Sequence, residues 1–233
     1  MEQKNQGICR FCLETFSDAT MTRHLLACKT KKEREAQELA NAKSTYPIYH
    51  IKVSSYRDYW MHIEMNATST LRELDNFLRK IWLECCGHLS MFTINDVDYQ
   101  DADEDSESWD SIIESIDNRL MDAMKVGDKF TYEYDFGTST DVESKVIAER
   151  QGALDEAVRI LARNSPYIYE CSECGRQAIV FCTECECLVC EECLADHECG
   201  EEMALPIVNS PRMGECGYIG DLDFDTFSHQ EKY

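Results

Sequence analysis

Cysteine and histidine residues near the N-terminus follow the spacing of metal ligands. Cys9 and Cys12 form a C-x2-C pair, and after eleven intervening residues His24 and Cys28 form an H-x3-C pair. Two thiolates on a tight turn can hold one ion, and a His and a Cys four residues apart lie on one helical face. Residues 1–30 cannot bury enough surface to fold alone, so metal would supply the missing stability. The spacing predicts a small zinc-stabilised module.

A second group of potential ligands lies within residues 165–200. Three C-x2-C pairs occur there, followed by an H-x-C pair, and repeated pairs of this kind are typical of zinc sites. Four protein ligands around each ion leave no position for water, which predicts a structural role. A redox role of the C-x2-C pairs is the alternative. The residues concerned are Cys171, Cys174, Cys182, Cys185, Cys187, Cys190, Cys193, His197 and Cys199.

Both groups resemble known zinc modules. The first resembles a zinc finger with two cysteine and two histidine ligands whose last histidine is replaced by Cys28, and the second resembles a B-box, whose ligands interleave. The B-box resemblance implies two sites, namely Cys171, Cys174, Cys190 and Cys193 for one ion, and Cys182, Cys185, His197 and Cys199 for the other. The H-x-C ending is tighter than in a B-box, so Cys187 could replace Cys199. We expect three ions, and closed sets of cysteine and histidine favour Zn2+ over Fe2+.

The composition limits the cellular compartment and the classes of binding partner that we expect. The N-terminus lacks the apolar stretch of a signal peptide, and no apolar run is long enough to span a bilayer. We therefore expect a cytoplasmic protein without membrane contact, whose fourteen cysteines bind metal rather than form disulfides. The net charge of −22 disfavours nucleic acid except through residues 1–45, which are slightly basic. A protein partner is expected, and the sequence leaves the oligomeric state open.

The remaining chain supplies the elements that position these residues. Residues 31–45 are charged and rich in helix formers, which predicts a solvated helix or helical linker, and residues 201–233 read as an acidic tail. Residues 46–164 predict an α+β domain with a mixed sheet. Thr70 and Glu73 form a capping box that starts a helix. We expect strands over 46–54, 60–65, 89–94, 129–135 and 141–149, helices over 70–82 and 112–124, and a mobile acidic loop over 95–111. For residues 157–163 the alternation favours a strand over a helix.

The central domain resembles the plasmid pRiA4b ORF-3-like family, also described as insertion-element passenger proteins. The resemblance spans about residues 46–216 and implies an α+β domain, for which β-grasp character is one option, and a link to mobile elements. It implies no mechanism, because the family's function is unknown. The segments that carry it are YHIKV at 49–53, LRELDNFLRKIW at 71–82, GHLSMF at 87–92, GDKFTYEYDFG at 127–137 and LPIVNSPR at 205–212.

Three classes of function are compatible with these features. The first is a zinc-braced adaptor that contacts another protein through exposed strand edges or the YDFG turn. The second is a nucleic-acid-associated factor that uses the N-terminal finger and the basic stretch 29–34. The third is an enzyme centred on Cys86, His88 and Asp135. We favour the first, because Cys85 and Cys86 can simply pack as small apolar residues and Asp135 can accept backbone N–H groups in a turn. We therefore assign no catalytic residue.

Overall fold

The computed structural model describes the chain except residues 1–4, 57, 102–111 and 221–233. The described residues form two compact units. The first, here called the sheet unit, contains residues 5–77 and 89–165. The second, the cysteine unit, contains residues 78–88 and 166–220. Within the described part of the chain, no helix is both long and apolar enough to cross a membrane.

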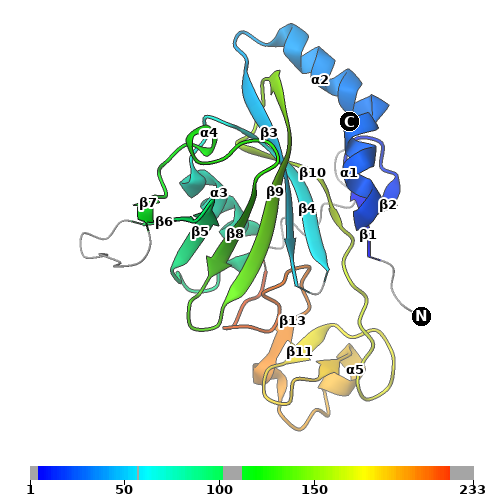
Figure 1. Ribbon diagram of the computed structural model, residues 1–233. Helices are drawn as coiled ribbons and strands as arrows, with labels where there is room; N and C mark the ends of the chain where they lie inside the picture. The colour runs from blue at the N-terminus through cyan, green and yellow to red at the C-terminus, as the bar shows by residue number, and fades with distance from the viewer. Residues whose placement is uncertain (1–4, 57, 102–111, 221–233) are drawn as a thin grey trace. The chain divides into compact units, whose positions relative to one another are not determined.

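The sheet unit is built on a ten-stranded mixed sheet with the order β2-β1-β10-β4-β3-β9-β8-β5-β6-β7 (Figure 1). Strands β6 and β7 pair in parallel, and the other neighbours are antiparallel. The α+β class is therefore confirmed. The strands are β1 (Gln6–Cys9), β2 (Thr15–Ser17), β3 (Tyr46–Ser55), β4 (Tyr59–Asn66), β5 (Ser90–Ile94), β6 (Val97–Gln100), β7 (Ile112–Ser115), β8 (Lys129–Tyr134), β9 (Thr140–Gly152) and β10 (Val158–Asn164).

The N-terminal residues are part of this sheet. Strand β1 pairs with β10, with Ile8 opposite Arg163, and β2 follows at the sheet edge. Helices α1 (Asp18–Ala27) and α2 (Lys29–Asn41) then continue along the same side of the unit (Figure 1). The segments that the sequence divides into a finger, a linker and a central domain thus form one unit. The strands β1 and β2 therefore extend the sheet beyond the strands that residues 46–164 contribute.

Helix α2 packs on the sheet through a buried charged side chain. Lys31 is only 6% exposed, and its Nζ lies 2.8 Å from Glu64 Oε1 on β4. Arg150 on β9 also contacts Glu64, with Nη2 2.6 Å from Oε2. The predicted helix is present, but this face of it is not solvated. Local sequence cannot show this, because the partners of Lys31 lie on distant strands.

Helix α3 (Leu71–Leu78) begins at the predicted capping box. The backbone N–H of Thr70 donates to Glu73 Oε2 at 2.7 Å, and the N–H of Glu73 donates to Thr70 Oγ1 at 3.3 Å. The helix continues directly into the π-helical turn η1 (Arg79–Leu83). This turn begins the part of the chain that belongs to the cysteine unit.

The helix predicted over residues 112–124 is wrong for its first part. Residues Ile112–Ser115 form the edge strand β7, with Val97 opposite Ile112, and only Leu120–Ala123 form a helix, α4. The apolar spacing resembled a helix, but a strand pairing with β6 decides the structure, and that pairing is non-local. Strand β6 also lies within the predicted acidic loop, of which residues 102–111 are outside the described residues.

The cysteine unit contains a small three-stranded sheet with the order β12-β11-β13. Its elements are β11 (Val180–Cys182), β12 (Leu188–Val189), α5 (Glu191–Leu194), the 3-10 turn η2 (Glu201–Met203) and β13 (Ala204–Pro206). Residues 201–220, expected as part of an acidic tail, include β13 and a small core of Val208, Met213 and Tyr218. Residues 221–233 are outside the described residues.

Candidate metal centres

The four predicted N-terminal ligands lie together in the sheet unit. Their ligand atoms are all within 4.8 Å of one another, and Cys12 Sγ is 3.4 Å from His24 Nε2. Cys9 ends β1, and Cys12 follows in the turn to β2. His24 lies in α1, and Cys28 caps this helix by donating its N–H to the His24 carbonyl at 2.7 Å. The β1–β2 turn therefore supplies Cys9 and Cys12, and helix α1 supplies His24 and Cys28. Together they form one set of four ligands, as a tetrahedral site requires.

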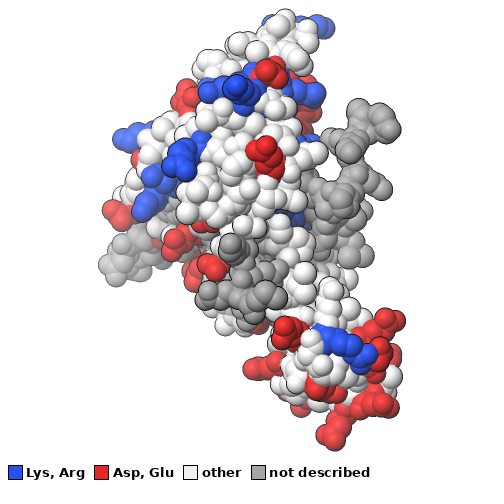
Figure 2. Space-filling view, turned by 90° about the vertical axis from the view of Figure 1, so that its right-hand side faces the viewer, with Lys and Arg blue, Asp and Glu red and all other residues white. Residues whose placement is uncertain are grey.

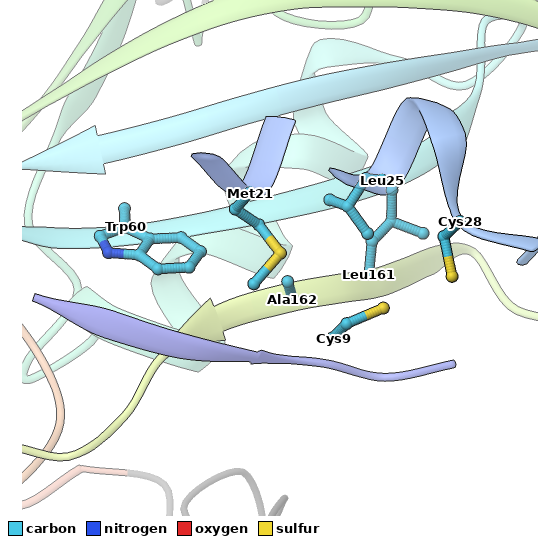
Figure 3. Close-up of a cluster of buried hydrophobic side chains, with 7 residues drawn as sticks. All are labelled: Cys9, Met21, Leu25, Cys28, Trp60, Leu161 and Ala162. Carbon is cyan, nitrogen blue, oxygen red and sulfur yellow. The ribbon is translucent and has the colours of Figure 1, made fainter. Parts of the chain in front are cut away.

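An apolar core supports this set from inside the unit (Figure 3). The indole of Trp60 and the backbone of Arg163 lie directly against Gly7. A Cβ added at Gly7 would be 2.5 Å from the indole and 2.1 Å from the Arg163 carbonyl oxygen. Burial raises the pKa of the Cys9 thiol to about 12, so a bound cation would be needed to hold it as a thiolate. The buried members of the core are Cys9, Met21, Leu25, Cys28, Trp60, Leu161 and Ala162.

The first predicted C-terminal set also comes together. The ligand atoms of Cys171, Cys174, Cys190 and Cys193 lie within 4.8 Å of one another. Cys190 directly precedes helix α5, which carries Cys193, and Cys174 Sγ lies 3.6 Å from Cys190 Sγ. Arg176 Nε donates to Cys174 Sγ at 3.3 Å, and this hydrogen bond lowers the pKa of the Cys174 thiol to about 6. The environment of Cys174 thus favours its thiolate form.

The second C-terminal set contains Cys182, Cys185, His197 and Cys199, again within 4.8 Å. His197 Nε2 is 3.4 Å from Cys185 Sγ, and its Nδ1 lies 3.1 Å from Glu173 Oε1. A carboxylate on the second ring nitrogen is the usual way to orient a metal-binding histidine. Cys187 is not a member of this set, and its thiol donates to the carbonyl of Cys185 at 3.4 Å. The geometry thus favours Cys199 over Cys187.

A fourth set was not predicted. It consists of Cys85, Cys86, His88 and Cys216, all in the cysteine unit. The interpretation of Cys86 as a packed apolar residue fails, because Cys86 is exposed. In the sequence, only the C-C-x-H spacing of residues 85–88 pointed to a metal site. No second pair of cysteine or histidine residues lies close to it in the chain. The fourth member, Cys216, follows 130 residues after Cys86, so proximity could not be read from spacing.

Asp135, the third residue of the enzyme hypothesis, has a local structural role. It lies in the sheet unit with a φ of +67°, and its Oδ1 accepts the N–H groups of Gly137 at 3.1 Å and Thr138 at 3.3 Å. These contacts match the turn interpretation of this residue. Its backbone N–H donates to the Leu89 carbonyl at 2.9 Å, which ties the YDFG turn to the start of β5.

The fold and the clusters define an α+β protein with sets of cysteine and histidine able to bind metal ions. The family model of plasmid pRiA4b ORF-3-like proteins matches residues 48–166, and the chain belongs to this family. The match runs from β3 through β10, so the N-terminal set and both predicted C-terminal sets lie outside it.

No curated protein matches the chain. Among solved structures, a protein of unknown function from Methanosarcina mazei Go1 is similar, with 16% identity and a TM-score of 0.41. The similarity covers 47% of this chain and 64% of that protein.

Proposed function

We propose that this protein is a zinc-binding adaptor that contacts another protein through the YDFG turn. The zinc half of the proposal is supported by the ligand sets, each of which offers either four thiols or three thiols and one imidazole. Such sets are typical of structural zinc, and they leave no open coordination position for a substrate. The metal would therefore hold the scaffold, and the function would reside in binding.

The observation that supports the binding part of the proposal is the exposure of two large apolar side chains, one on the YDFG turn and one directly before β5. Leu89 is 64% exposed and Phe136 is 46% exposed, and the backbone hydrogen bond from Asp135 to Leu89 holds their segments side by side. Asp135 Oδ1 restrains the turn through two backbone N–H groups. Apolar anchors on a preorganised surface are typical of protein interfaces, because little conformational entropy is lost on binding.

The nucleic-acid alternative has less support. Of the basic stretch 29–34, Lys31 is buried against Glu64, and Arg34 Nε lies 2.8 Å from Glu38 Oε1. These pairs reduce the positive charge available to phosphates. Exposed acidic side chains gather over residues 170–198 of the cysteine unit (Figure 2), and they would repel a nucleic-acid backbone.

Site-specific photo-crosslinking tests the proposal. A photoreactive phenylalanine analogue replaces Phe136 in the full chain in cells, and the matched control carries it at Tyr46, which is 45% exposed in the same unit. We expect a discrete protein adduct from position 136 and none from position 46, and Leu89→Ser should reduce the adduct at least fivefold. Equal adducts at both positions, or RNA or DNA as the main adduct, would refute the YDFG contact.

A further inference from the structure

The fourth set has the same composition as two of the predicted sets. Cys85, Cys86, His88 and Cys216 supply three thiols and one imidazole, as do the N-terminal set and the set that contains His197. Every cysteine except Cys187 belongs to one of the four sets. Cysteines that merely pack would not be expected to gather in fours with a histidine.

The distances within the fourth set fit a tetrahedral ion. Cys86 Sγ lies 3.4 Å from Cys216 Sγ and 3.8 Å from Cys85 Sγ, and His88 Nε2 lies 3.3 Å from Cys216 Sγ. Around zinc, neighbouring sulfur and nitrogen ligands are roughly 3.5–3.8 Å apart. The Cys86–His88 separation of 2.9 Å is shorter, so seating an ion would move these two atoms apart by roughly half an ångström.

The backbone at both ends of the set is shaped to bring the ligands together. Cys216 has a φ of +47°, a left-handed conformation that is unfavourable for an L-residue. Gly87, between Cys86 and His88, has a φ of +81°, and its N–H donates to Glu84 Oε1 at 2.5 Å. A ligand bond to Cys216 would offset the cost of its conformation.

Contacts behind the set hold the two segments against each other. Ser210 Oγ donates to the Trp82 carbonyl at 2.5 Å, and Cys85 packs against the small core that contains Val208 and Met213. Arg212 Nη2 lies 3.8 Å from Cys85 Sγ, where its charge would stabilise a thiolate. All of these residues belong to the cysteine unit.

We propose that Cys85, Cys86, His88 and Cys216 form a fourth zinc site, which joins the end of the π-helical turn to the segment 207–218. The bound ion would hold this C-terminal segment against residues 85–88. The proposal is independent of the YDFG contact, because it concerns only the cysteine unit. It raises the expected content from three zinc ions to four.

Native mass spectrometry of the full, reduced chain tests the fourth site. The wild type should carry four zinc ions, and Cys216→Ser and His88→Ala should each carry three. The matched control is Cys187→Ser, which removes the one cysteine outside the sets and should retain four. Hydrogen exchange over residues 207–218 should become at least tenfold faster in Cys216→Ser and stay unchanged in the control.

Two results would overturn the proposal. The first is a wild type with three ions whose count neither Cys216→Ser nor His88→Ala lowers. The second is a non-reduced wild type with three ions and a mass about two daltons lower, in which peptide mapping places a disulfide between Cys86 and Cys216. Because two variants remove ligands from opposite segments, misfolding of one does not decide the outcome.

Discussion

Replacing Cys28 with serine should remove one zinc ion and unfold the N-terminal part of the sheet unit. Cys28 is buried beside the apolar core formed with Trp60 and Leu25, and a serine oxygen is a much weaker zinc ligand. Structural zinc contributes about 10–16 kcal/mol to the folding of finger peptides, which matches or exceeds the stability of a whole domain. Losing the ion should therefore open β1, β2 and α1.

Hydrogen exchange with mass spectrometry measures this effect locally. We expect protection over residues 6–27 to fall at least a hundredfold, while β3 and β9 lose far less, because they pair with each other along the whole length of β3. Cys187→Ser, a cysteine replacement outside every set, should leave the protection unchanged. Full protection of residues 6–27 in Cys28→Ser would show that the apolar core alone maintains this region.

The second large effect concerns the carboxylate under helix α2. Glu64 is buried, and its two oxygens accept from Lys31 at 2.8 Å and from Arg150 at 2.6 and 3.0 Å. Burial alone would raise the pKa of Glu64, but the Arg150 hydrogen bonds and the Lys31 charge lower it to about 2. Because the folded-state pKa lies below the unfolded value, the contribution is present at pH 7 and is lost as the pH falls toward 2.

Glu64→Gln should lower the free energy of unfolding by about 3 kcal/mol, since it removes the most buried carboxylate of the network and leaves Lys31 and Arg150 only Glu35 as an anionic partner. Urea denaturation at pH 7 with zinc present measures the loss. The matched control is Asp122→Asn, which breaks an exposed pair with Arg119 at 2.7 Å and should cost less than about 1 kcal/mol. A loss for Glu64→Gln as small as that of the control would contradict a stabilising buried network.

The sequence predicted those parts of the molecule whose signals are local. Alternation along residues 46–54 and 129–135 indicated the strands β3 and β8, because successive side chains of a strand face opposite sides. The capping box located the start of α3 for the same reason, since its hydrogen bonds join residues only three apart. The spacing of the N-terminal ligands is likewise set by one turn and one helix.

The features that the sequence did not reveal depend on long-range contacts. Ile112–Ser115 is a strand because it pairs with β6, and Lys31 is buried because Glu64 lies beneath it on β4. Neither the pairing with β6 nor the contact with Glu64 can be recognised from the residues that neighbour Ile112 or Lys31 in the sequence. Cys216 is the clearest case, because nothing near it in the chain indicates that it meets Cys86 and His88.

Cobalt substitution tests most directly the central claim that the metal centres are closed and structural. Co2+ replaces zinc in the full chain, and its visible absorption reports on coordination geometry and on thiolate ligands. We expect the spectrum of four-coordinate, thiolate-rich cobalt, unchanged when azide is added, because each set already supplies four protein ligands. A spectrum that shifts with azide would reveal an open coordination position, and the protein would then be a candidate metalloenzyme instead of a metal-braced adaptor.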